Sequence, residues 1–168
     1  MAVGRSILTS KAAIAVIVGL TLAGCATKNE LPGNAGGLGL DPNGANAGSQ
    51  QDFTVNVGDR VFFETDSSIL TQTARATLDK QAAWLIRYAN YPITIEGHAD
   101  ERGTREYNIA LGARRAAATR NYLAAKGVRM NRIRTISYGK ERPVAVCNDI
   151  SCWSQNRRAV TLLAAPTG

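Results

Sequence analysis

Between residues 53 and 163 the sequence alternates between patterns typical of strands and patterns typical of helices. A β-rich run at residues 60–63 precedes a helical pattern in which apolar residues recur every three or four positions from Ala74 to Ala89, with Thr71 as its N-cap. Residues 93–99 then alternate apolar and polar side chains, as a strand with one polar face does. Strands and helices that alternate in this way pack as layers around one core.

The second half of the region continues the alternation. An Ala-rich helix is expected over residues 107–125 and ends at Lys126-Gly127, and strands are expected at residues 133–138 and 159–163. The order predicts an α+β fold, a βαβαβ-type sandwich with a mixed sheet and a final strand, with right-handed crossovers where neighbouring strands are parallel. A chain of 168 residues has room for one such domain and its appendages.

The first residues have the pattern of a secretion signal. Arg5 and Lys11 precede an uncharged apolar run over residues 12–23, which is shorter than the roughly 20 residues that a membrane-spanning helix needs. The stretch Leu22-Ala23-Gly24-Cys25 resembles the bacterial lipobox, so cleavage is expected before Cys25, whose thiol would carry lipid. The alternative is cleavage elsewhere, with Cys25 an ordinary thiol.

An acylated Cys25 would anchor the protein to a membrane, because several acyl chains together bind stably. Residue 26 is Ala rather than Asp, which by analogy with the lipoprotein-sorting rule indicates the outer membrane. The stretch that follows is rich in Gly, Asn and Pro and lacks periodicity, which predicts a flexible tether. We therefore expect a signal peptide at residues 1–24, a lipidated N-terminus and tether at residues 25–52, and a folded periplasmic domain at residues 53–168.

Charge and cysteines restrict the possible partners. The chain has a formal net charge of +7, but an exported basic protein meets lipid headgroups and wall carboxylates rather than nucleic acid. With Cys25 lipidated, Cys147 and Cys152 remain in an oxidising compartment, which favours a disulfide between them. A zinc site is the competing interpretation, but the chain contains a single His. We expect neither a metal nor another cofactor.

One continuous motif, Gly97–Ala116 (GHADERGTREYNIALGARRA), resembles the OmpA-like peptidoglycan-binding family. Three further stretches, at residues 62–68, 137–143 and 156–160, match the same family. Together the matches cover most of residues 60–163. The resemblance implies an OmpA-like domain that binds peptidoglycan non-covalently.

The ligand that the resemblance implies is meso-diaminopimelate in the stem peptide, whose side chain ends in an ammonium and a carboxylate. Asp100 is expected to accept from the ammonium, and Arg115 to hold the carboxylate bidentately. Asn108 lies two helical turns before Arg115 and so shares its face, whereas Arg114 is turned by about 100°. Family correspondence adds further residues around the ligand: the backbone N–H groups of Thr65 and Asp66, with His98, Gly103 and Leu111 beside them.

Simpler roles are open for the same residues. Asp100 could be only a loop or cap residue, Arg115 only a solvated helix charge, and His98 only a hydrogen-bonded surface residue with a place at the rim of the site. Their assignment to a binding site depends on the family resemblance.

Two other classes of function compete with wall binding. His98, Asp100 and Glu101 lie close in sequence, but one His without a paired base or nucleophile elbow is weak support for an enzyme, so no catalytic residue is expected. A protein-interaction module is the stronger alternative, since lipidated members of the family are partners of TolB in the Tol-Pal system. Residues 138–143 and the loop after Asp100 are the expected contact with TolB.

If Cys25 is lipidated, replacing this one residue should change the compartment in which the protein is found. Cys25→Ser removes the acylated thiol and should move the mature protein from the membrane fraction to the soluble periplasm, because no acyl chain then holds it. Fractionation with an exported control checks this. Unchanged membrane association of the exported variant would contradict an acyl anchor.

Overall fold

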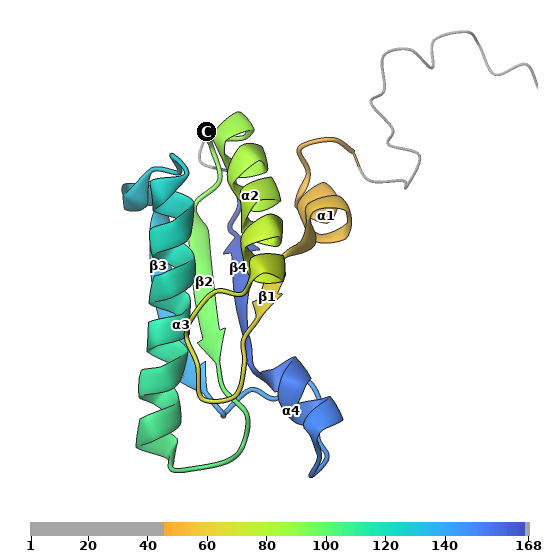
Figure 1. Ribbon diagram of the computed structural model, residues 1–168. Coiled ribbons are helices and arrows are strands. Elements are labelled where there is room, and N and C mark those ends of the chain that lie inside the picture. Colours follow the sequence, from red (N-terminus) through yellow and green to blue (C-terminus); the bar gives the residue numbers. More distant parts are fainter. Residues whose placement is uncertain (1–45, 167–168) are drawn as a thin grey trace, which may run out of the picture. The chain divides into compact units, whose positions relative to one another are not determined.

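A computed structural model describes residues 46–166. Within them, helices α2 and α3 lie side by side over one face of a four-stranded sheet (Figure 1). This confirms the expected α+β class. In chain order the elements are α1 (Gln50–Asp52), η2 (Phe53–Gly58), β1 (Arg60–Phe62), α2 (Gln72–Arg87), β2 (Ile93–His98), α3 (Arg105–Ala125), η3 (Met130–Arg132), β3 (Ile133–Gly139), α4 (Ile150–Asn156) and β4 (Arg158–Leu163).

The sheet is mixed, as predicted. Its strand order is β1-β4-β2-β3, with β4 antiparallel to both β1 and β2, and β2 parallel to β3. Helix α3 connects the two parallel strands, which is the kind of crossover that a parallel pair requires. The core lies between the sheet and the two long helices, and contains Leu78, Leu85, Ile93, Ile95 and Leu123.

Both long helices begin at a threonine cap. Thr71 Oγ1 accepts a hydrogen bond from the Ala74 N–H at 3.1 Å, which confirms the predicted start of α2. Thr104 Oγ1 accepts from the Tyr107 N–H at 3.2 Å, so α3 begins earlier than residue 107. Helix α2 ends at Arg87, so the predicted helix was too long by its last two residues.

Helix α3 approaches strand β2 as closely as backbones allow. A Cβ added at Gly97 would lie 1.8 Å from the carbonyl oxygen of Gly112, so no larger residue fits at this position unless the backbone of α3 moves away. The Ser137 hydroxyl of β3 donates to the Ile109 carbonyl of α3 at 2.7 Å. These contacts hold the first half of α3 directly against the ends of β2 and β3.

The folded domain starts earlier than the sequence predicted. Residues 50–52 were assigned to the tether, but they form α1, and Asp52 is buried, with its Oδ2 accepting from Trp84 Nε1 at 2.8 Å. The Phe53 ring packs 5.0 Å from the Trp84 ring. Helix periodicity could not reveal α1, because three residues are too few to show it.

Helix α4 was also not predicted. It begins after Asp149, which accepts from the Ser151 N–H at 2.7 Å, and it spans seven residues. The expected disulfide joins Cys147 to Cys152 and ties the start of α4 to the loop before it, with a Cα–Cα distance of 5.6 Å.

The predicted signal peptide, the predicted lipidation site at Cys25 and most of the predicted tether lie outside the described residues. Within residues 46–166, no helix has both the length and the apolar character needed to cross a bilayer.

Candidate functional site

A hollow of about 240 Å³ lies where β2 ends, between the start of α3 and the loop after β1. It contains six of the eight binding residues expected from the sequence, together with two others, Arg102 and Tyr107. Its lining residues are Thr65, Asp66, Asp100, Arg102, Gly103, Tyr107, Asn108 and Leu111.

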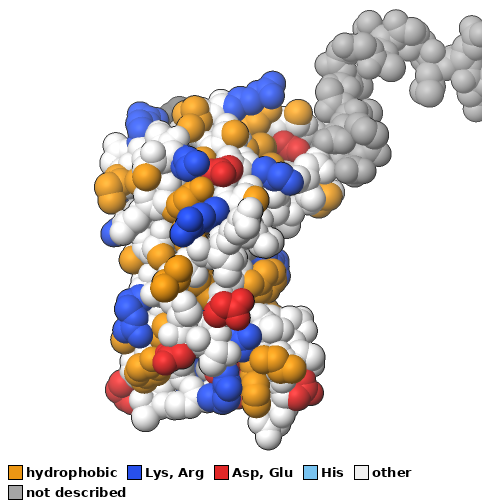
Figure 2. Space-filling model, viewed as in Figure 1, with side chains coloured by type: hydrophobic (Ala, Val, Ile, Leu, Met, Phe, Trp, Pro, Cys, Tyr) orange, Lys and Arg blue, Asp and Glu red, His pale blue; other side chains and the backbone are white. Residues whose placement is uncertain are grey.

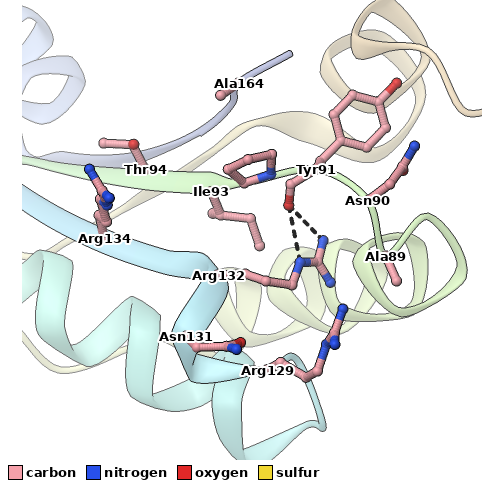
Figure 3. A pocket seen from close by; sticks show the side chains of 11 residues that line it. Ala89, Asn90, Tyr91, Ile93, Thr94, Arg129, Asn131, Arg132, Arg134 and Ala164 are labelled. Atoms are coloured by element: carbon pink, nitrogen blue, oxygen red, sulfur yellow. Dashed lines mark hydrogen bonds between the residues drawn. The ribbon is translucent and has the colours of Figure 1, made fainter. Parts of the chain in front are cut away.

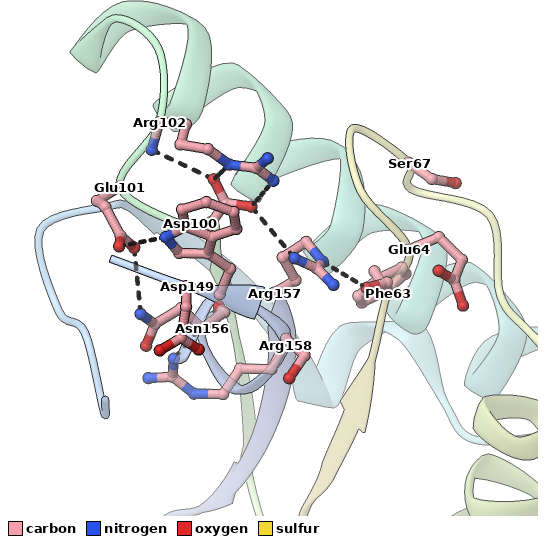
Figure 4. A network of polar contacts seen from close by, with 12 residues as sticks. Phe63, Glu64, Ser67, Asp100, Glu101, Arg102, Asp149, Asn156, Arg157 and Arg158 are labelled. Atoms are coloured by element: carbon pink, nitrogen blue, oxygen red, sulfur yellow. Dashed lines mark hydrogen bonds and ion pairs between the residues drawn. The ribbon is translucent and has the colours of Figure 1, made fainter. Parts of the chain in front are cut away.

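Asp100 is the buried anion of this hollow. Arg102 donates to both of its carboxylate oxygens, from Nε to Oδ1 at 3.1 Å and from Nη2 to Oδ2 at 2.8 Å (Figure 4). Arg157 Nη1 lies 3.5 Å from Oδ2 on the other side. Burial acts to raise the pKa of Asp100, but the hydrogen bonds from Arg102 outweigh it, and the pKa is below its ordinary value. Asp100 is therefore ionised at neutral pH. The alternative interpretation of Asp100 as only a helix cap is wrong, because Thr104 caps α3.

Thr65 and Asp66 form the centre of a tight turn. The Ser67 N–H donates to the Glu64 carbonyl at 3.3 Å, and Asp66 has a φ of 53°, a left-handed conformation that Asp tolerates better than most residues. Among the hydrogen bonds of the described residues, none has the N–H of Thr65 or Asp66 as its donor. Thr65 and Asp66 both line the hollow, and the donor role that family correspondence implies for their N–H groups stays a prediction.

Arg115 does not line the hollow and is fully buried, so the interpretation as a solvated helix charge is wrong. Its Nε donates to the Ser67 carbonyl at 2.8 Å, Nη1 to the His98 carbonyl at 2.8 Å, and Nη2 to the Glu64 carbonyl at 3.1 Å. Burial lowers the pKa of Arg115 to about 10, opposed by the nearby Asp100 carboxylate, so the side chain remains charged at neutral pH. The open fork expected from the sequence is largely occupied by the protein itself.

The remaining lining residues hold the loop after β2 in place. Asn108, which was expected to share a helix face with Arg115, is buried, and its Nδ2 donates to the Arg102 carbonyl at 2.7 Å. Gly103 has a φ of 85°, which only glycine adopts freely. Leu111 forms part of the apolar wall. Tyr107, which sequence reasoning did not select, donates its hydroxyl hydrogen to Asp66 and so connects α3 to the turn.

His98 does not have the rim position expected for it. The residue is 1% exposed, its ring stacks on Tyr138 at 5.7 Å, and it is absent from the lining of the hollow. Although Glu96 Oε2 lies 3.4 Å from Nε2, burial and the nearby Arg158 and Arg142 lower the pKa of His98 to about 4. Only its backbone carbonyl contributes to the site, through Arg115.

A second pocket, of about 420 Å³, opens where β2 and β3 begin and so lies at the opposite end of these strands (Figure 3). Arg129, Arg132 and Arg134 line it without any acidic residue. Arg132 is already bound to backbone, with Nε donating to the Tyr91 carbonyl at 3.0 Å and Nη1 to the Leu85 carbonyl at 3.0 Å. A ligand with an ammonium group finds no anion there, whereas the hollow at Asp100 offers both signs of charge.

The described residues contain no cluster of His, Cys, Asp and Glu that could hold a metal ion. A catalytic group would need a nucleophile or base placed beside a reacting atom. The groups at the hollow are instead ionised and hydrogen-bonded to one another, an arrangement that suits recognition of a charged ligand.

Comparison with known proteins points to one family. The sequence profile of the OmpA family matches residues 62–157. A peptidoglycan-associated lipoprotein of Rhizobium meliloti (strain 1021) is 68% identical over 159 residues, which cover 95% of this chain and 90% of that protein. A peptidoglycan-associated lipoprotein of Brucella melitensis biotype 1 is 66% identical over 159 residues, with 95% of each chain covered.

Among solved structures, the peptidoglycan-associated lipoprotein from Burkholderia pseudomallei superposes with a TM-score of 0.65 at 36% identity. The match covers 69% of this chain and 100% of that one. The names of these relatives describe lipoproteins that associate with peptidoglycan, and none of them describes an enzyme.

Proposed function

The chain belongs to the OmpA family and, within it, to the peptidoglycan-associated lipoproteins, and from this premise we propose that its hollow binds the meso-diaminopimelate of the peptidoglycan stem peptide. Members of this family are binding lipoproteins of the cell envelope rather than enzymes. The finer parts of the proposal are the ligand, the outer-membrane anchor at Cys25 and the role in the Tol-Pal system. The bound domain would then link the outer membrane to the wall without a covalent bond to it.

The observation that carries the proposal is the pairing of a buried anion with a group of free donors in one hollow. The free end of diaminopimelate bears an ammonium and a carboxylate on one carbon. Asp100 supplies the acceptor for the ammonium, and the N–H groups of Thr65 and Asp66 supply donors for the carboxylate. A ligand with an ammonium alone would leave the N–H groups of Thr65 and Asp66 without an acceptor, which costs binding free energy in a desolvated site.

Arg115 contributes to the carboxylate side from beneath. A guanidinium has five N–H groups, and three of those of Arg115 donate to backbone carbonyls. One N–H remains on each terminal nitrogen, which is the number that a bidentate carboxylate accepts. Because Arg115 is fully buried, its main effects are to fix the turn that carries the free donors and to add positive potential below them.

Wall binding should depend on Asp100 more than on charge in general. Asp100→Asn keeps the shape of the side chain but removes the negative charge, and should weaken sedimentation of the full chain with diaminopimelate-type sacculi by roughly 5- to 50-fold, the range between an exposed and a desolvated ion pair. Asp79→Asn is the matched control, since Asp79 pairs with Lys126 at 2.7 Å, on α2 and away from the hollow.

A comparison of two wall types tests whether the site recognises the carboxylate of the ligand. Lys-type sacculi lack the second carboxylate and should bind the unaltered chain weakly, with less sensitivity to Asp100→Asn. Equal binding of both wall types, or equal losses in Asp100→Asn and Asp79→Asn, would mean that overall charge holds the wall and that the proposed recognition is wrong.

A second candidate function is binding of TolB, for which an exposed apolar surface is the supporting observation. Val144, Val146 and Ile150 are largely exposed around the loop before α4, where Figure 2 shows apolar side chains at the end of the domain that carries α4. A hollow of about 340 Å³ beside them is also lined by Glu101, which follows Asp100 in the chain. Exposed apolar groups gathered in this way are typical of protein interfaces, and this surface adjoins the wall site.

A single substitution separates the two candidate functions. Val146 is 88% exposed, so Val146→Ser should lower capture of the full chain by purified TolB, through lost apolar contact, without changing sedimentation with sacculi. Val55→Ser is the control, since Val55 is 59% exposed on η2 and lies outside this surface. Capture that is unchanged by Val146→Ser, or reduced equally by both variants, would contradict a TolB contact at this surface.

A further inference from the structure

The carboxylate of Asp100 has no acceptor position left for a ligand. Its Oδ1 accepts from the backbone N–H of Arg102 at 3.2 Å and from Arg102 Nε at 3.1 Å. Its Oδ2 accepts from Arg102 Nη2 at 2.8 Å and faces Arg157 Nη1 at 3.5 Å. An ionised carboxylate offers about four acceptor positions, and all of them are taken. An ammonium can therefore reach Asp100 only if one of these donors leaves.

Arg157 is not the donor that leaves. Its side chain is 6% exposed, and its Nε donates to the Phe63 carbonyl at 3.1 Å inside the domain (Figure 4). Moving it would unpair that carbonyl and break the buried link between β1 and the start of β4.

The Arg102 side chain is the donor that can leave. It is 43% exposed, and its guanidinium donates only to Asp100 among the hydrogen bonds of the described residues. The backbone at the same position is fixed, because Asn108 Nδ2 donates to the Arg102 carbonyl at 2.7 Å. The side chain can thus swing into solvent without loosening the loop that carries Asp100.

Trp153 of α4 stabilises the Arg102 side chain in the position in which it pairs with Asp100. The guanidinium carbon lies 4.2 Å from the centre of the indole ring, within the range of a cation–π contact. The indole is itself oriented by its Nε1–H, which donates to Glu101. Helix α4, whose start is tied to the preceding loop by the Cys147–Cys152 disulfide, therefore supplies one wall of the space that Arg102 occupies.

We propose that Arg102 is a competing cation that occupies the place of the ligand's ammonium at Asp100 and must be displaced when the wall binds. This inference rests on the proposed recognition of diaminopimelate. A ligand with an ammonium alone only exchanges one cation for another at Asp100 and gains little. A ligand that also carries a carboxylate gains the free donors of Thr65 and Asp66, and this second contact drives the displacement. Arg102 thus lowers the affinity of the site for both ligands by the same amount, and only the ligand with the carboxylate recovers that loss.

The test compares two arginines that carry the same charge. Arg102→Ala empties the ammonium position, whereas Arg105→Ala removes one positive charge nearby from a residue that pairs with Glu141 at 3.3 Å and does not touch Asp100. With the full chain in detergent micelles, Arg102→Ala should bind diaminopimelate-type sacculi about 3- to 10-fold more tightly than Arg105→Ala does, the range expected from loss of one partly exposed competing ion pair. Its gain for Lys-type sacculi should be of similar size, because both ligands displace the same cation from Asp100.

Fluorescence follows the displacement directly, because Trp153 touches the Arg102 guanidinium. Free meso-diaminopimelate should change the tryptophan emission of the unaltered chain and of Arg105→Ala, but not that of Arg102→Ala. Binding by Arg102→Ala that is equal to or weaker than that of Arg105→Ala, or an emission change that persists without Arg102, would overturn the proposal. If Asp100→Asn still loses binding while Arg102→Ala fails these tests, only the displacement of Arg102 is rejected and the proposed recognition of diaminopimelate stands. If the unaltered chain binds neither wall type, both proposals are rejected.

Discussion

The buried guanidinium of Arg115 is the interaction on which the site depends. It joins three separate parts of the chain, since α3 supplies the side chain, β2 supplies the His98 carbonyl, and the turn after β1 supplies the carbonyls of Glu64 and Ser67. A buried charge is tolerated only when its donors are satisfied, and here the backbone satisfies them. The same contacts hold the turn in a conformation in which the N–H groups of Thr65 and Asp66 remain unbound. The free donors of the hollow thus follow from the position of one arginine.

The packing of α3 on the sheet makes this position possible. Gly97 and Gly112 allow the helix and β2 to touch through backbone alone, so Arg115, less than one turn after Gly112, reaches the end of the strand. Asp100 follows the same strand and lies beside the same helix. Asp100 is held by two other arginines and Arg115 by backbone carbonyls, so an anion and a cation stay at fixed places. In the proposed binding mode, groups of opposite sign thus serve the two charges of one zwitterion.

The sequence predicted the layers, the strands and both long helices because each has several periods of its pattern. Thr71 indicated where α2 begins, and Gly127 indicated where α3 ends. Asp100, Asn108 and the turn at Thr65 were placed by family resemblance, and the structure brings them together. The burial of Arg115 and the pairing of Arg102 with Asp100 could not be predicted, because both depend on which distant backbone approaches a flexible side chain. His98 was misplaced because its face of the sheet is covered, by Tyr138, Arg142 and Arg158, and alternation alone does not show what covers a face.

The central claim is that one ligand end is held by an anion on one side of the hollow and by backbone donors on the other. Nitrogen-15 chemical shifts of the labelled full chain in micelles, titrated with free meso-diaminopimelate and separately with cadaverine, a diamine that has no carboxylate, test it most directly. The account predicts that diaminopimelate shifts the amide signals of Thr65 and Asp66 and the Nε signal of Arg115, and that cadaverine leaves these three signals unchanged. Equal shifts with both compounds, or no shift at Thr65 and Asp66 when diaminopimelate is bound, would contradict it.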